Sequence, residues 1–138
     1  MFVVEEDYKV VIGDTALKVL SQTDEINRER AEKQAVEEIS GYLRPVYDVS
    51  EIFAKTGEDR NSLVVMFTCD IALYHMAASA PGRMGAEVRK ERYDRAIAWL
   101  KDVQSGKVVP DLPMITSPTG ESGSPLRYGG EKPKNNVW

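Results

Sequence analysis

The sequence predicts an all-α protein: a small helical bundle of about three long helices plus short N-terminal helices, with an extended C-terminal tail. Three long segments space their apolar residues three or four positions apart, as one face of a helix requires. Proline and glycine separate these segments, and a Gly/Ser/Pro-rich stretch follows the last one. The 138 residues are enough for a domain with its own core. We therefore expect a helical domain over residues 1–115 and a flexible tail over residues 116–138.

The first elements are predicted to be two short helices. In Glu5–Ile12, Tyr8, Val11 and Ile12 share one face, and acidic residues stand at the start, where the helix dipole favours them. Gly13 is expected to end this helix. Thr15–Leu20 is predicted as a second short helix or turn.

The first long helix is predicted to start after an N-cap at Thr23 or Asp24 and to end near Leu43, before Pro45. Its apolar stripe has i, i+4 spacing and comprises Ala31, Ala35, Ile39 and Leu43. The charged residues on its other faces, including Glu37 and Glu38, are expected to face solvent. Arg44–Asn61 is predicted as an irregular connection that packs on the domain.

The second long helix is predicted from Leu63 to about Ala80, with Asn61 or Ser62 as its cap. It is apolar nearly all round, which is typical of the buried centre of a bundle. Four of its residues are expected to contact both neighbouring long helices: Val64, Phe67, Ile71 and Tyr74. The third long helix is predicted from Gly85 to Ser105, with Gly106 after its end. We expect a solvated charged face on it, made by Arg89, Lys90, Glu91, Arg92, Asp94 and Arg95.

The residue inventory predicts no catalytic site, no metal site and no cofactor. His75 is the only histidine and Cys69 the only cysteine, so neither a zinc ligand set nor a disulfide is available. We expect Cys69 to be structural and His75 to be hydrogen-bonded inside the bundle. No phosphate-binding loop or nucleophile motif is found. The apolar run Leu63–Cys69 is too short to span a membrane, so we expect a cytosolic origin.

Two groups of residues are candidates for interactions. The formal net charge of −4 argues against a nucleic-acid binder. The basic residues around Arg89 and Arg92 are expected to form either an ordinary helix surface, an ion-paired subunit interface or, less favoured, a DNA contact. The apolar residues of the tail include Leu126, Tyr128, Val137 and Trp138. They belong either to a disordered end or to an arm that docks on another protein.

Three stretches suggest a family: GYLRPVYDV from Gly41, RNSLVVMFTCDIALYHMA from Arg60, and RYDRAIAWLKDVQSGKVVPDLP from Arg92. Over Glu5–Pro113 the chain resembles the small helical proteins encoded among the virion assembly genes of Mu-like prophages. Its layout is also similar to that of the head–tail connector (adaptor) proteins of long-tailed phages. The matching residues are core and turn positions.

The resemblance implies a structural role in the virion. Connectors of this kind form a ring, usually twelvefold, beneath the portal protein, and they offer a platform to neck or tail components. DNA only passes through such a ring, and an extended C-terminal arm reaches the portal. The resemblance thus makes the four apolar tail residues candidate portal-docking residues. It implies no membrane, no small-molecule substrate, and a virion location after a stay in the host cytoplasm.

A ring needs two different faces of each subunit in contact. We expect Glu37 and Glu38 of one subunit to meet Arg89 and Arg92 of the next, and the free protein to be a monomer. The alternative is a small helical protein-binding adaptor or regulator unrelated to virion assembly. An enzyme is not expected.

Overall fold

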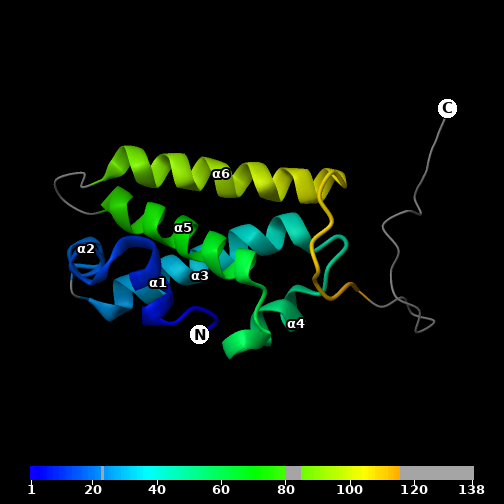
Figure 1. Ribbon diagram of the computed structural model, residues 1–138, viewed down its shortest axis with the longest axis horizontal. Coiled ribbons are helices and arrows are strands. Elements are labelled where there is room, and N and C mark those ends of the chain that lie inside the picture. Colours follow the sequence, from blue (N-terminus) through cyan, green and yellow to red (C-terminus); the bar gives the residue numbers. More distant parts are fainter. Residues whose placement is uncertain (23, 80–84, 116–138) are drawn as a thin grey trace.

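The computed structural model describes residues 1–22, 24–79 and 85–115. These residues form a helical bundle whose elements follow the chain in order (Figure 1). Two short helices, α1 (Glu5–Ile12) and α2 (Asp14–Leu20), precede the long helix α3 (Glu25–Leu43). A short helix α4 (Val49–Ala54) and a 3₁₀ turn η1 (Gly57–Asp59) lead to the long helices α5 (Ser62–Ser79) and α6 (Ala86–Ser105). The predicted all-α class, with three long helices and short N-terminal ones, is confirmed.

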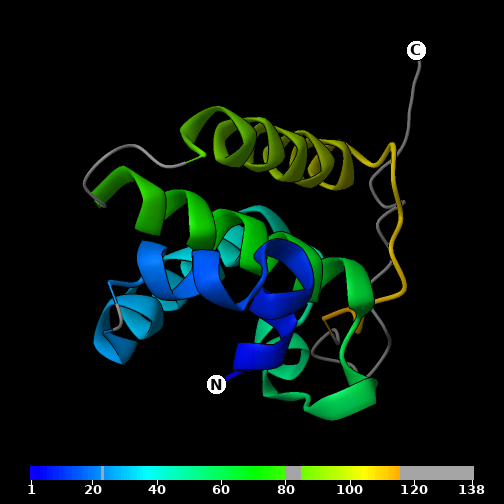
Figure 2. The ribbon, with the colours of Figure 1, turned by 60° about the vertical axis from the view of Figure 1, so that its left-hand side comes forward.

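Helix α5 is the centre of the bundle. It contacts α3, α6, α1 and α2, and Figure 2 shows it between α6 on one side and α1 on the other. Val64, Phe67 and Ile71 are buried, and Tyr74 is half-buried. Phe67 packs on Trp99 of α6 with 5.0 Å between ring centroids, and Tyr74 stacks on Tyr93 at 4.2 Å. The prediction of a buried central helix is confirmed.

Local capping sets the ends of the long helices. The Asp24 side chain accepts a hydrogen bond from the Ile26 N–H, which makes it the N-cap of α3. The Asn61 side chain accepts from the N–H groups of Leu63 and Val64, so Asn61 caps α5. Gly106 ends α6 with φ +87°, a left-handed conformation that glycine adopts without strain. Polar side chains next to the predicted apolar stripes were therefore good indicators of the boundaries.

The connection from Arg44 to Asn61 is more regular than expected. It contains α4 and η1, whereas the sequence predicts an irregular connection throughout. Asp48 caps α4 by accepting from the Glu51 N–H at 3.1 Å, and Ile52 is buried. The apolar positions in Val49–Ala54 have helical spacing, but six residues make too short a run for periodicity to reveal.

The segment after α6 returns to the junction between α3 and α4. Tyr47 and Met114 form an isolated antiparallel bridge. The Asp48 N–H donates to the Pro113 carbonyl at 2.9 Å, and the Ile115 N–H donates to the Val46 carbonyl at 3.0 Å. The predicted extended segment Lys107–Ile115 is thus attached to the bundle. The predicted tail, residues 116–138, lies outside the described residues.

Within the described part of the chain, no helix is both long and apolar enough to cross a membrane.

Candidate functional site

Arg92 and Arg89 do not lie on a solvated face of α6, which corrects the prediction from sequence. Arg92 donates a hydrogen bond from Nε to Oδ1 of Asp70 on α5 at 2.6 Å, and the Asp70 side chain is only 2% exposed. Burial raises the pKa of Asp70, although Arg92 acts in the opposite direction. The reason is geometric: positions 89, 92 and 96 share one helical face, and that face packs on α5.

Arg89 is buried next to this pair. Its Nη1 atom has no hydrogen-bond partner among the residues that the structure describes. Burial, together with the like charge of Arg92, lowers the pKa of Arg89, while Asp70 raises it. We call Asp70, Arg89 and Arg92 the α5–α6 charge cluster. It holds two cations and one anion between two packed helices.

Glu38 joins all three long helices, so it is not the freely solvated charge that the sequence suggested. Its Oε1 lies 3.0 Å from His75 Nε2 on α5, and its Oε2 accepts a hydrogen bond from the Tyr93 hydroxyl on α6. Burial, reinforced by Glu38, raises the pKa of Tyr93, which keeps that hydroxyl protonated as a donor. The expected hydrogen bond of His75 inside the bundle is confirmed.

Glu37 differs from its neighbour. Its side chain is 75% exposed, and it forms a surface ion pair with Arg44 at 3.4 Å. Glu38, Arg89 and Arg92 make their contacts inside the subunit. Glu37 is therefore the one predicted intersubunit residue whose side chain lies mostly in solvent.

The two residues weighed as reactive groups have structural surroundings. Cys69 is fully buried, and burial raises the pKa of its thiol, which disfavours the nucleophilic thiolate. His75 lies on a different face of α5 and is bound to Glu38. No group of three metal-ligating side chains is found in residues 1–22, 24–79 and 85–115.

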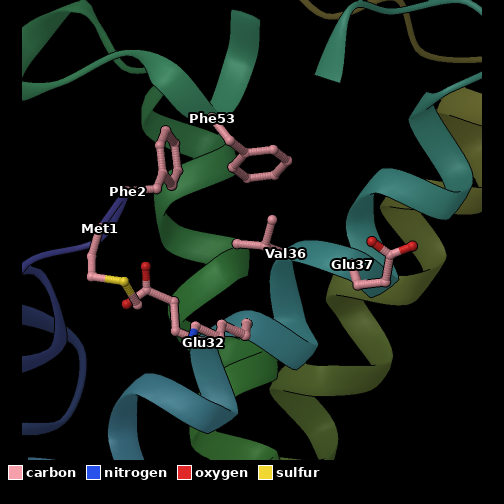
Figure 3. A pocket seen from close by; sticks show the side chains of 7 residues that line it. Met1, Phe2, Glu32, Val36, Glu37 and Phe53 are labelled. Carbon is pink, nitrogen blue, oxygen red and sulfur yellow. The ribbon is translucent and has the colours of Figure 1, made fainter. Parts of the chain in front are cut away.

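An apolar cleft that the sequence did not reveal lies between the N-terminal segment, α3 and α4. We call it the N-terminal cleft; its volume is about 240 Å³, and it is lined by Met1, Phe2, Glu32, Lys33, Val36, Glu37 and Phe53. Figure 3 shows Phe2, Phe53 and Val36 around one open space, with Met1 and Glu32 on its other side. Phe2 and Phe53 meet edge to face at 4.9 Å.

Two polar residues hold the N-terminal segment so that Phe2 forms one wall of this cleft. Arg60 donates to the Phe2 carbonyl at 2.8 Å and to Asp7 at 2.6 Å. Glu32 is buried and accepts from the Val3 N–H at 3.1 Å. Burial raises the pKa of Glu32 despite these hydrogen bonds. Because the lining comes from three separate elements, no local sequence pattern predicts the cleft.

Leu126, Tyr128, Val137 and Trp138 lie outside the described residues. Among the described residues, the exposed intersubunit candidate Glu37 lies in the lining of the N-terminal cleft.

Comparison with known proteins gives a match to a protein family. No curated protein and no solved structure matches this chain. The sequence model of the family described as "Bacteriophage Mu, Gp36" matches residues 3–126, which is most of the chain and includes every described helix. This chain belongs to the bacteriophage Mu Gp36 family.

Proposed function

We propose that this protein is a phage or prophage head–tail connector (head completion) subunit, which forms a ring beneath the portal and links the capsid to the tail. The observation that carries the proposal is the family match over residues 3–126, which makes the chain a phage protein. Its helical bundle with a further C-terminal segment agrees with the layout of connector proteins. We propose no cofactor and no enzymatic activity. The subunit would be a monomer in the host cytoplasm before assembly and would then become part of the virion.

The C-terminal segment is the proposed portal-docking arm. It follows Ile115, which is hydrogen-bonded to Val46 at the α3–α4 junction. The 23 residues beyond Ile115 could extend up to about 75 Å at about 3.3 Å per residue. This distance is enough to reach a portal ring, and Leu126, Tyr128, Val137 and Trp138 supply apolar anchors.

The proposed ring interface uses Glu37 of one subunit and exposed cations on α6 of the next. Arg89 and Arg92 are held in the α5–α6 charge cluster, and Glu38 is bound to His75 and Tyr93. The exposed cations of the same helix are Lys90, Arg95 and Lys101, and the first two lie nearest to Arg89 and Arg92 in the sequence. We therefore assign the interface to Glu37 facing Lys90 and Arg95. DNA would only pass through the ring, and the net charge of −4 supports passage over tight binding.

Truncation tests the docking arm. The cut belongs after Ile115, because Met114 and Ile115 pair with Tyr47 and Val46 and are part of the bundle. We expect the truncated protein to melt near the temperature of the full chain but to fail to co-sediment with portal rings. A full-length control with alanine at the four anchor positions should fail in the same way. Normal sedimentation of either variant would contradict the docking role.

Charge reversal tests the ring. Glu37→Lys should leave the melting temperature unchanged and weaken ring formation on the portal, and Arg95→Glu should restore it. Glu58→Lys makes the same change of charge at an exposed site on η1 and serves as the matched control. If the unmodified full chain neither binds portal rings nor assembles on them, the connector proposal fails. The protein-binding adaptor unrelated to virion assembly would then be favoured.

A further inference from the structure

The N-terminal cleft has the chemistry of a receptor for an aromatic residue next to a cation. Phe2, Phe53 and Val36 supply apolar walls, and Met1 supplies a flexible thioether that adapts to different shapes. Its charged groups are the carboxylates of Glu32 and Glu37, the Lys33 ammonium and the N-terminal amino group of Met1, whose charge acts on Glu32. Glu37 is largely exposed at this site, so it can meet an incoming positive charge without being desolvated first.

A segment of the same chain offers the complementary chemistry. In Leu126–Arg127–Tyr128 a cation stands between an aliphatic and an aromatic residue. Residues 126–138 contain three cations, Arg127, Lys132 and Lys134, against one acid, Glu131. Arg127 is therefore opposite in charge to Glu37, the exposed carboxylate of the cleft lining. A tyrosine is also well suited to such a site, because its ring packs on other aromatic rings while its hydroxyl stays in water.

The attachment of Ile115 to the bundle brings the segment that follows it within reach of the cleft. Ile115 is hydrogen-bonded to Val46, and Phe53 of the cleft wall lies only seven residues further along the chain, on α4. The six residues of α4 span about 9 Å. The 13 residues from Ile115 to Tyr128 extend up to about 43 Å, which exceeds the length of about 30 Å of α6, the longest helix described. The segment can thus reach the cleft without leaving its own subunit.

Tethering makes even a weak contact effective. A short flexible connection gives an effective concentration on the order of 1 mM. A segment that binds the cleft with a Kd of about 0.1 mM would then occupy it about nine-tenths of the time. We infer that in the free protein the N-terminal cleft binds the Leu126–Tyr128 segment of the same chain, with the Tyr128 ring packed against the apolar wall of Phe2, Phe53 and Val36 and with Arg127 beside Glu37. The inference concerns the isolated chain and does not depend on the connector proposal.

Disulfide cross-linking of the full-length protein tests this contact. Lys33→Cys places a thiol in the cleft lining, and Gly129→Cys places one next to the unchanged Tyr128. The native Cys69 does not compete, because it is fully buried. Under mild oxidation we expect an intramolecular disulfide, seen as a monomer of altered mobility in a non-reducing gel. Its rate should not change with protein concentration.

Two further variants make the result specific. Lys90→Cys with Gly129→Cys places the first thiol at an exposed position of α6. Figures 1 and 2 show that α6 lies away from α4. This pair should react at least tenfold more slowly. Adding Tyr128→Ala to the cleft pair should lower its rate to that level, while the melting temperature stays unchanged.

Equal rates for all three proteins would overturn the inference. A disulfide-linked dimer from the cleft pair would also overturn it, because the occupant would then come from a second copy. Neither result requires a portal, so failure here is distinct from failure of the proposed function.

Discussion

Arg92 on α6 donates its Nε hydrogen to the Asp70 carboxylate on α5 across 2.6 Å, and Asp70 is almost fully shielded from water. Arg89, also buried, lies beside this pair. The contact therefore offsets part of the positive charge that Arg89 and Arg92 bring between α5 and α6, and it links the two helices. Removing the only anion of the α5–α6 charge cluster should be far more costly than removing a surface carboxylate.

Asp70→Ala is expected to lower the free energy of unfolding by about 3 kcal/mol, because it leaves two adjacent arginines without their anion. The control is Asp94→Ala, which removes the exposed partner of Lys90 on α6. It should change stability by no more than about 0.5 kcal/mol. Urea denaturation of both variants measures the difference. Equal losses would show that the cluster does not contribute more than a surface ion pair.

Phe67→Ala is expected to cost about 3–5 kcal/mol, because a buried aromatic ring packed on Trp99 is lost and a cavity remains. Leu63→Ala, one turn earlier on α5, is the matched control, since Leu63 is 43% exposed. It should cost about 1 kcal/mol or less. Thermal melting of the two variants compares them, and similar losses would argue against α5 as the buried centre.

The protonation of Glu32 should contribute to the pH dependence of the free energy of unfolding. Because burial raises the pKa of Glu32 above its ordinary 4.5, the folded state binds the proton more tightly than the unfolded chain. The contribution of Glu32 to stability therefore falls as the pH rises from that value through the raised pKa. Glu32→Gln keeps an acceptor for the Val3 N–H and should raise the melting temperature at pH 7, with a gain that shrinks toward pH 4.

Asp7 should make stability depend on pH in the opposite direction to Glu32, so it serves as the internal control. Burial acts to raise its pKa, but the hydrogen bonds from Arg60 and from the Val4 N–H outweigh burial and hold the pKa below its ordinary value. Its stabilisation is present above that ordinary value and is lost as the pH falls through the lowered pKa. Asp7→Asn should accordingly reduce stability at pH 7. Melting curves of both variants between pH 4 and pH 8 that shifted in the same direction would contradict this assignment.

His75 should matter for stability alone. His75→Gln is expected to retain portal binding and to lower stability by about 1 kcal/mol through a weaker bond to Glu38. Glu38→Ala should cost more, about 1–3 kcal/mol, because the Tyr93 hydroxyl also loses its acceptor. Any hydrolytic or transfer activity of the native protein that disappeared in His75→Gln would refute the proposal that the protein is not an enzyme.

The sequence predicted the long helices because their signals are local. The bounds of α1 agree with the prediction at both ends, and Asp24, Asn61 and Gly106 mark helix ends through contacts with nearby backbone groups. The sequence pattern does not predict the short helix α4, because six residues show too little periodicity. Hydrophobic patterning thus identifies an element only when it repeats over several turns.

The candidate site was less predictable, because its contacts join residues far apart in the chain. Arg92 has the helical spacing of a core position, but its charge suggests solvent, and its partner Asp70 is on another helix. Glu38 likewise needs His75 and Tyr93 from two other helices. Local periodicity states which face of a helix a residue occupies, and it does not state which polar group lies opposite.

The Tyr47–Met114 bridge has a mechanical consequence. Tension applied to the chain beyond Ile115 meets the hydrogen bonds from Ile115 to Val46 and from Asp48 to Pro113 before it reaches α6. While these bonds hold, a pull is transmitted to the α3–α4 junction, so α6 is not peeled from α5. If they break, Lys107–Ile115 is released and lengthens the chain by up to about 30 Å at about 3.3 Å per residue. Under such a pull, this attachment would separate first, and the added length of chain would reduce the force on the packed helices.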